Sequence, residues 1–247
     1  MNYLSAEIMG IFIIALIAIA FLYASVGHGG ASGYIALMAT FSFPLTYIKP
    51  TALILNVFIS GISFFYFKKH NHFKWKLFYP FAIASIPAAF LGGYIAIDPK
   101  LYKIILGVFL AAAILRILLI PSREQVKVNA FKPYTALFIG CGIGFLSGMI
   151  GIGGGIILSP IIIILGWANM KTAAAISALF IFVNSISGII GYSLTNQIEM
   201  ESFKLIPIAL VGGVLGAIYG SNKVSNKVLK QILSVVLLIA CVKLMVL

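Results

Sequence analysis

Long apolar runs, separated by short polar or glycine-rich stretches, follow one another along the chain. A helix crosses a membrane with about 20 apolar residues. The runs and breaks predict ten segments, at residues 8–26, 34–46, 50–67, 77–97, 101–120, 133–150, 155–166, 172–193, 203–221 and 228–246. Two of them, 34–46 and 155–166, are too short to cross at about 1.5 Å per residue, and each follows a glycine cluster. The pattern therefore predicts an all-α integral membrane protein with eight full spans and two short half-helices.

The two halves of the chain resemble each other. A displacement of 127 residues aligns Ser60-Gly61-Ile62 with Ser187-Gly188-Ile189, Pro80 with Pro207, Gly93 with Gly220 and Lys103 with Lys230. A displacement of 124 aligns Gly27-His28-Gly29-Gly30 with Gly151-Ile152-Gly153-Gly154. We predict two repeats of about five segments each, residues 1–120 and 133–247, joined by a cytoplasmic linker at residues 121–132.

The charge of equivalent loops changes sign between the halves. Residues 68–76 contain four lysines, whereas their counterpart, residues 194–202, has no lysine and two glutamates. Cytoplasmic loops are rich in Lys and Arg, so equivalent loops are expected on opposite sides and the repeats are expected to be inverted. With the N-terminus outside, the basic residues on the cytoplasmic side are Lys68, Lys69, Lys74, Lys76, Arg116, Arg123, Lys127, Lys132, Lys171, Lys223, Lys227 and Lys230. Inverted repeats are typical of secondary transporters, whose substrate sites lie near the membrane midplane.

The composition agrees with lipid as the main solvent. The chain is 62% hydrophobic and 9% charged, with a mean hydropathy of +1.14. A soluble domain has about 25% charged residues. The net charge of +12 would suggest a nucleic-acid partner in a soluble protein, but here the basic residues lie between apolar runs. We expect a multi-pass protein of a bacterial or archaeal inner membrane, with the lipid bilayer as a partner and no nucleic acid.

Two glycine clusters, residues 26–33 and 150–155, carry the candidate chemistry. Consecutive glycines destabilise a helix, so each cluster is expected to end one helix and begin another. A helix broken inside a membrane leaves N–H groups that need a partner, and a new helix N-terminus favours an anion. Neither cluster is a phosphate-binding P-loop, because no Gly-Lys-Ser/Thr follows. The glycine pairs 92–93 and 212–213 are expected to serve only close helix packing.

The predicted substrate site combines the two clusters with nearby polar side chains. Its residues are Gly27, His28, Gly29, Gly30, Ser32, Asn56, Gly151, Gly153, Gly154, Gly155, Ser159 and Asn184. His28 has three open roles: a cation that pairs with an oxyanion, a proton acceptor, or a neutral side chain that bonds a backbone carbonyl. No basic residue is expected to be buried, which leaves backbone N–H groups and His28 as the anion ligands.

The stretch GIGGGIILSP at residues 151–160, in the second half of a duplicated apolar chain, resembles the sulfite exporter TauE/SafE family of membrane transporters. The resemblance covers essentially the whole chain. It implies transport of small sulfur-containing anions such as sulfite, thiosulfate or organosulfonates. The first half departs from the family pattern, because His28 interrupts its glycine run and no proline stands at the place that matches Pro160.

The function predicted from these features is secondary transport of a small anion by alternating access. The alternatives are a passive anion channel and a metal-ion permease that uses His28. An enzyme is not expected, because the apolar segments contain neither paired carboxylates nor a nucleophile–base pair. We expect no catalytic residue, no cofactor and no metal site, and assembly into a homo-oligomer stays open.

Overall fold

A computed structural model of the protein describes residues 6–95 and 129–223, together with Asp98, Leu101, Ile104, Val108, Ser225, Val228 and Gln231. Within these ranges every regular element is helical. The α-helices are α1 (Ala6–Ser25), α2 (Ala31–Thr40), α3 (Leu45–Lys69), α4 (Trp75–Tyr94), α6 (Pro133–Ile150), α7 (Gly155–Ile164), α8 (Met170–Ser193) and α9 (Ile206–Ile218). A 3₁₀ helix, η1 (Met200–Leu205), precedes α9, and a π-helical turn, η2 (Tyr219–Lys223), follows it.

The all-α membrane class is confirmed. Six of the described helices are long and apolar enough to cross a membrane, and α2 and α7 are the two short apolar helices. The first short helix begins at Ala31 rather than at the predicted residue 34, because Gly30 already supplies the turn that starts it. The predicted segments 101–120 and 228–246 and the linker 121–132 lie largely outside the described residues.

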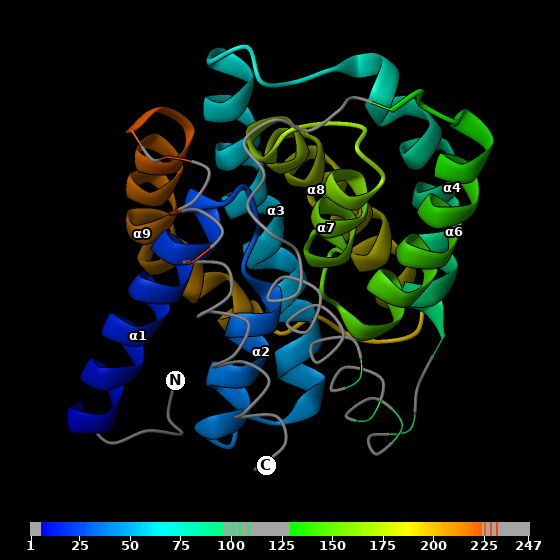
Figure 1. The fold of residues 1–247 in the computed structure, drawn as a ribbon. Coiled ribbons are helices and arrows are strands. Elements are labelled where there is room, and N and C mark those ends of the chain that lie inside the picture. The colour runs from blue at the N-terminus through cyan, green and yellow to red at the C-terminus, as the bar shows by residue number, and fades with distance from the viewer. Residues whose placement is uncertain are drawn as a thin grey trace.

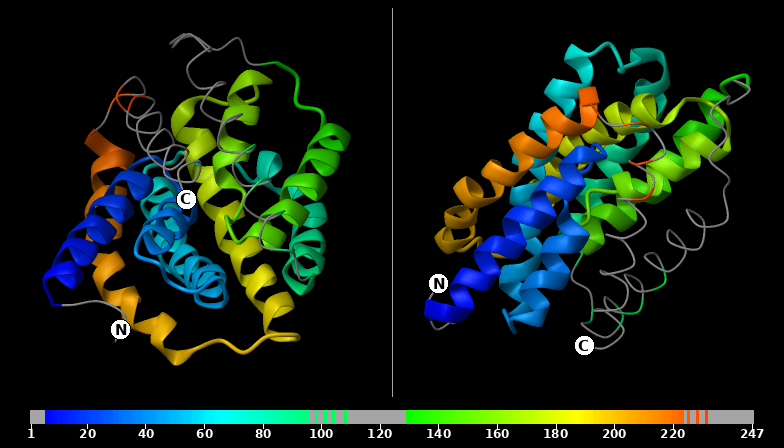
Figure 2. Two further views of the ribbon diagram at one scale, coloured as in Figure 1. Left: turned by 90° about the horizontal axis from the view of Figure 1, so that it is seen from below. Right: turned by 60° about the vertical axis from the view of Figure 1, so that its left-hand side comes forward.

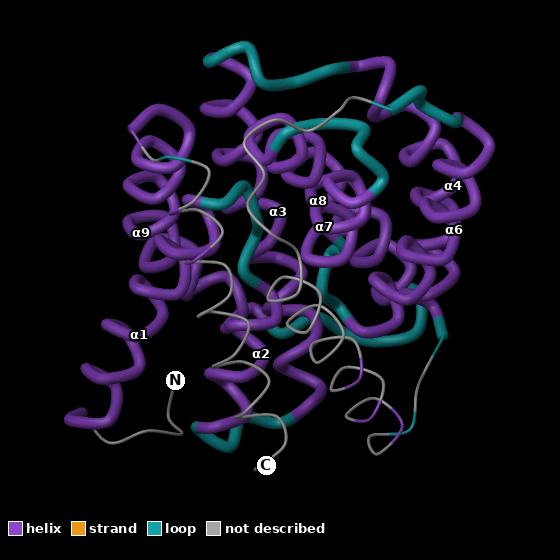
Figure 3. Tube along the Cα trace, in the orientation of Figure 1, coloured by secondary structure: helices purple, strands orange, loops and turns teal. Residues whose placement is uncertain are grey.

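Each short helix returns toward the end of the molecule at which the preceding long helix begins, and the two hairpins enter from opposite ends (Figure 1). The chain rises through α1 from the lower end, turns, and returns to that end through α2. It descends through α6 from the upper end, turns, and returns to the upper end through α7. The loops in Figure 3 place both turns between the two ends of the molecule.

Helix pairing repeats across the centre of the molecule. The long helices α3 and α8 pack against each other, and α2 packs on α3 as α7 packs on α8. At the flanks, α9 packs on α1 and α4 packs on α6, as the views in Figure 2 also show. A two-fold duplication would produce this pattern, with the first four described helices matched to the last four. The inverted repeats and their boundaries nevertheless stay predictions.

Rows of small residues bring the flanking helices close together. The glycines Gly140, Gly144 and Gly148 of α6 face the backbone of α4, and Gly212, Gly216 and Gly220 at the other flank face that of α1. Without a hydrophobic driving force in lipid, close backbone approach supplies much of the packing energy. The prediction that Gly92-Gly93 and Gly212-Gly213 serve close packing is confirmed, because a Cβ at any of the four would overlap a neighbouring helix.

Candidate functional site

The first break, between α1 and α2, is held by glycine. The N–H groups of Gly27 and His28 still bond to carbonyls at the end of α1, and α2 then begins after Gly30. Gly30 has a φ of 98°, in the left-handed region that residues with a Cβ rarely adopt. It offers no side chain to cap α2, so the first N–H groups of this helix need partners from elsewhere.

The second break, between α6 and α7, has the same design. Gly151 ends α6 in the left-handed conformation, and Gly154, with a φ of 76°, precedes α7. Gly154 has no side chain that could accept a hydrogen bond from the first N–H groups of α7. Two helix N-termini whose own N-cap residue is a glycine, each with the positive end of a helix dipole, therefore lie at the two breaks.

Asn56 of α3 lies between the breaks. Its Oδ1 accepts a hydrogen bond from the N–H of Ala31 at 3.0 Å, so it caps α2 from a different helix. Its Nδ2 is fully buried and has no hydrogen-bond partner. A Cβ placed on Gly153 would lie 2.7 Å from that Nδ2, so the free donor lies against the second break. One side chain thus contacts both breaks and presents an unused N–H group.

The His28 side chain, like that of Asn56, contacts both breaks. Its ring is 1% exposed, with Nδ1 2.9 Å from the carbonyl oxygen of Val26 and Nε2 3.0 Å from that of Gly155. The Oγ of Ser159 is 3.4 Å from Nε2 and donates to Ser177 Oγ at 2.6 Å. Carbonyl oxygens only accept hydrogen bonds, and a neutral imidazole has one N–H to donate. Only the doubly protonated ring can donate to both carbonyls at once.

Unused polar groups concentrate at the break glycines. The described residues contain five buried side-chain atoms without a partner: Tyr34 Oη, Asn56 Nδ2, Ser147 Oγ, Asn184 Oδ1 and Ser185 Oγ. Four of the five residues lie beside a break, because Tyr34 contacts Gly30, Ser147 contacts Gly154, and both Asn56 and Ser185 contact Gly153. Buried polar atoms normally have partners, so such a cluster points to a ligand.

The backbone adds further donors at the same place. Among the described residues, the recorded hydrogen bonds include none from the N–H groups of Gly29, Gly30, Gly153 or Gly154. No carboxylate stands among the buried side chains of the described residues. The breaks therefore offer donors without a competing negative charge, which suits an anion.

The remaining predicted residues lie in different surroundings. Ser32 is buried, and its Oγ is 2.6 Å from the hydroxyl of Tyr23. Asn184 donates from Nδ2 to the carbonyl of Phe180 in its own helix, at 2.8 Å. Both stay predictions. Sequence reasoning counted Ser185 only among the polar residues near the midplane and did not name Tyr34, although each is close in sequence to a chosen residue.

No lysine or arginine is among the fully buried side chains of the described residues, as expected, but Lys49 is an intermediate case. This lysine of α3 is partly buried, and a Cβ on Gly151 would lie 3.1 Å from its Cγ. Because Lys49 stands one turn inside its helix, rather than in the preceding loop, the inward turn of α6 covers its stem. A lysine near the start of an apolar run next to Pro50 was the available signal in the sequence.

A metal site has no support in the described part of the chain. No three residues among His, Cys, Asp and Glu gather there in a way that could hold an ion. Both ring nitrogens of His28 face carbonyl oxygens or a serine hydroxyl. The metal-permease alternative therefore has no second strong ligand at this site.

Comparison with known proteins agrees with the resemblance seen in the sequence. The family described as "Sulfite exporter TauE/SafE" matches residues 11–244. The probable membrane transporter protein y4hK of Sinorhizobium fredii is 38% identical, over 72% of this chain and 74% of that protein. The probable membrane transporter protein MJ0441 of Methanocaldococcus jannaschii is 34% identical, over 65% of this chain and 62% of that protein. The probable membrane transporter protein YunE of Bacillus subtilis is 26% identical, over 67% and 68%. No solved structure matches the chain.

Proposed function

The chain belongs to the sulfite exporter TauE/SafE family of multi-pass membrane transporters, and on that premise we propose that it is a secondary carrier of a small sulfur-containing anion. The substrate class is sulfite, thiosulfate or an organosulfonate. The anion binds where the two helix breaks meet. The observation that carries the proposal is Asn56, which caps α2 with its Oδ1 and presents an unpaired, buried Nδ2 to the second break.

The surroundings of Asn56 support an oxyanion rather than a cation. The N-termini of α2 and α7 contribute the positive ends of two helix dipoles, and the hydroxyl of Ser185 is a further unused donor at Gly153. A small anion with several oxygens can accept hydrogen bonds from all of these groups at once. A metal cation would meet donors instead of ligands.

The arrangement of the two hairpins supports alternating access as the mechanism. The α1–α2 hairpin opens to one end of the molecule and the α6–α7 hairpin to the other (Figure 1). Within the described residues, the hydrogen bonds between the two hairpins are those of the His28 ring, to the carbonyl of Gly155 and to the hydroxyl of Ser159. Moving one hairpin away from the shared site would open it to one side while the other hairpin keeps the opposite side closed. Energy would come from the anion gradient, the membrane potential or a coupled proton.

Flux into proteoliposomes tests this function. We expect saturable uptake of sulfite, thiosulfate or a sulfonate, with countertransport, and no uptake of divalent metals. Saturable countertransport distinguishes a carrier from a passive channel. If no anion moves, and none changes the melting temperature, the proposal is wrong.

Variants of the polar residues at the breaks test, in the same flux assay, whether the anion binds there. Asn56→Asp keeps the acceptor for Ala31 but replaces the free donor with a negative oxygen, so uptake should fall about tenfold or more. Ser185→Ala should raise the KM several-fold. Ser187→Ala is the matched control, because that hydroxyl donates to the carbonyl of Ile86 in a helix interface away from Gly153. Equal effects of Ser185→Ala and Ser187→Ala would argue against a site at the breaks.

A further inference from the structure

A partly buried lysine lies beside the second break. Lys49 stands one turn inside α3, which begins at that end (Figure 1). Its stem packs against Gly151. The end of α3, which has Lys68 and Lys69, and the start of α8, which has Lys171, lie at the upper end (Figure 1), so the lower end is the outer face by the positive-inside rule.

The charge of Lys49 is held in position without being neutralised. No ion pair or hydrogen bond is recorded for its Nζ within the described part of the chain. The Nζ lies 5.2 Å from the centre of the Tyr192 ring, a cation–π contact that leaves the charge available to an anion.

Pro50 explains why the Tyr192 ring lies there. A proline inside a helix has no N–H to donate to the carbonyl four residues earlier. That carbonyl belongs to Thr46, and the hydroxyl of Tyr192, at the end of α8, donates to it at 3.3 Å. The proline therefore fixes the tyrosine, and the tyrosine ring supports the lysine that precedes the proline.

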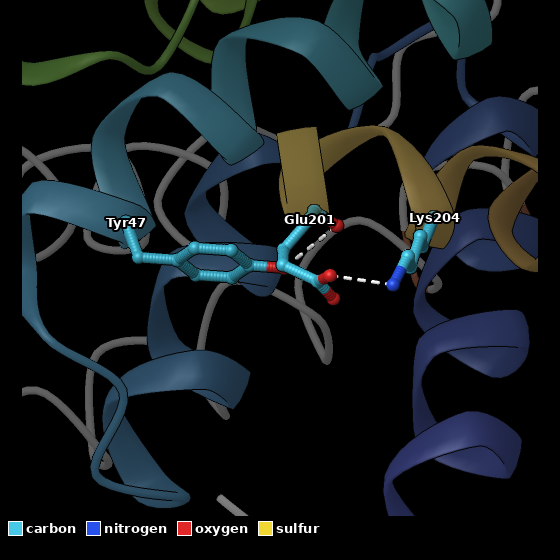
Figure 4. A network of polar contacts seen from close by, with 3 residues as sticks. All are labelled: Tyr47, Glu201 and Lys204. Atoms are coloured by element: carbon cyan, nitrogen blue, oxygen red, sulfur yellow. Dashed lines mark hydrogen bonds and ion pairs between the residues drawn. The ribbon is translucent and has the colours of Figure 1, made fainter. Parts of the chain in front are cut away.

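A neighbouring acid at the same end is already engaged. The carboxylate of Glu201 in η1 pairs with Lys204, at 2.5 Å between Oε1 and Nζ (Figure 4). The hydroxyl of Tyr47, on α3, donates to the backbone carbonyl of Glu201 at 3.2 Å. Glu201 is thus held on η1 by its own lysine rather than by Lys49.

The position of Lys49 has an uncharged counterpart in the other half. Gly27 and Gly151 match at a displacement of 124 residues, and each packs on the long helix of the opposite half. A Cβ on Gly151 would meet Lys49, whereas one on Gly27 would lie 2.7 Å from the Cβ of Ala174. A charged side chain therefore stands at only one of these two equivalent contacts.

We propose that Lys49 is the first binding residue for the anion that approaches from, or leaves to, the outer face. This inference rests on the proposed function. Lys49, Leu53 and Asn56 follow one face of α3, at spacings of four and three residues, and the second break runs along that face. Seven residues of helix span about 10 Å, so an oxyanion held at Lys49 is one short step from Asn56.

Transport measured separately from the two faces tests this role. Labelled sulfite and thiosulfate are presented to right-side-out and to inverted membrane vesicles. Lys49→Gln should raise the KM from the outer face about tenfold, with a smaller change in maximal flux, and should leave the KM from the inner face within about twofold. Lys49→Arg should keep the KM of the unaltered protein.

Lys204→Gln is the matched control, because it removes the same charge at the same end from a lysine that is already paired. Lys49→Met, which keeps the apolar stem against Gly151, replaces Lys49→Gln if the latter does not fold. An unchanged outer KM in the charge-free variants, or an equal rise in Lys204→Gln, would overturn the role of Lys49 and leave the proposed function standing. Absence of anion flux in the unaltered protein would overturn both.

Discussion

At the scale of single residues, His28 links two elements that the sequence separates by more than a hundred positions. Its ring lies between a carbonyl of its own break and the carbonyl of Gly155, the first residue of α7. Gly154, the N-cap of α7, has no side chain that could contact the other hairpin. The His28 ring supplies a hydrogen bond between the two hairpins. Its protonation state therefore affects both the contact between hairpins and the charge at the site.

Replacing His28 by Ala should destabilise the protein by about 2 kcal/mol, because the carbonyls of Val26 and Gly155 lose their partner in a buried place. Thermal unfolding in detergent measures this change, and anion flux should fall with it. His70→Ala serves as the control, since its ring bonds to the carbonyl of Tyr66 at the partly exposed end of α3. We expect that control to change stability by less than about 0.5 kcal/mol. Equal stability of both variants would show that His28 is no structural link.

At the scale of elements, the backbone approach between α4 and α6 is set by which face of a helix has glycine. Gly144 faces α4, where a Cβ would lie 2.6 Å from Cα of Ser85 and 2.8 Å from its Cβ. Gly142, two residues earlier, faces open space and has no atom within 4 Å of a Cβ. The same residue type therefore has opposite roles within one helix.

Gly144→Ala should destabilise the protein by about 1–3 kcal/mol, because the added methyl forces two helices apart. Gly142→Ala should be neutral or stabilise by up to about 1 kcal/mol, since alanine has the higher helix propensity. Melting temperatures of the two purified variants in the same detergent check the prediction. If both glycines tolerate alanine equally, the α4–α6 interface is looser than the structure indicates.

At the scale of the whole molecule, the ends differ in charge. The end of α3, the loop after it and the start of α4 together have four lysines, Lys68, Lys69, Lys74 and Lys76, and lie at the upper end, whereas the loop between α8 and α9 lies at the lower end with the N-terminal part of α1 (Figure 1). The positive-inside rule then predicts that the upper end lies in the cytoplasm. This orientation determines which face of the membrane the α1–α2 hairpin opens to, and hence the direction from which Lys49 is reached.

Cysteine labelling tests the orientation. In a background with Cys141 and Cys241 replaced by Ser, Lys69→Cys should react with a membrane-impermeant maleimide only in inverted vesicles. Gln197→Cys, which is exposed in the loop after α8, should react only in right-side-out vesicles. Labelling of both positions from the same side would exclude an inverted relation between the two halves.

Much of the fold was predictable because membrane solvent restricts the choices. Apolar run length predicted the described long helices, and the glycine clusters predicted both breaks, since few other sequences end a helix in lipid. Element ends were less certain, as at Ala31, because a three-residue shift leaves the apolar pattern unchanged. The fold class and the family were thus available from the sequence alone.

The tertiary structure decided which side chains reach the breaks. Asn56 was predicted, and the fold gives it contacts with both clusters. Asn184 was predicted by the same reasoning, yet its neighbour Ser185 is the residue at Gly153, because successive residues of a helix point about 100° apart. The predicted segments left Lys49 in a loop, whereas in the structure it lies within α3 and its stem packs against Gly151 at the end of α6. Spacing along the chain determines where a membrane helix breaks, whereas the rotation and contact of packed helices determine what the break can bind.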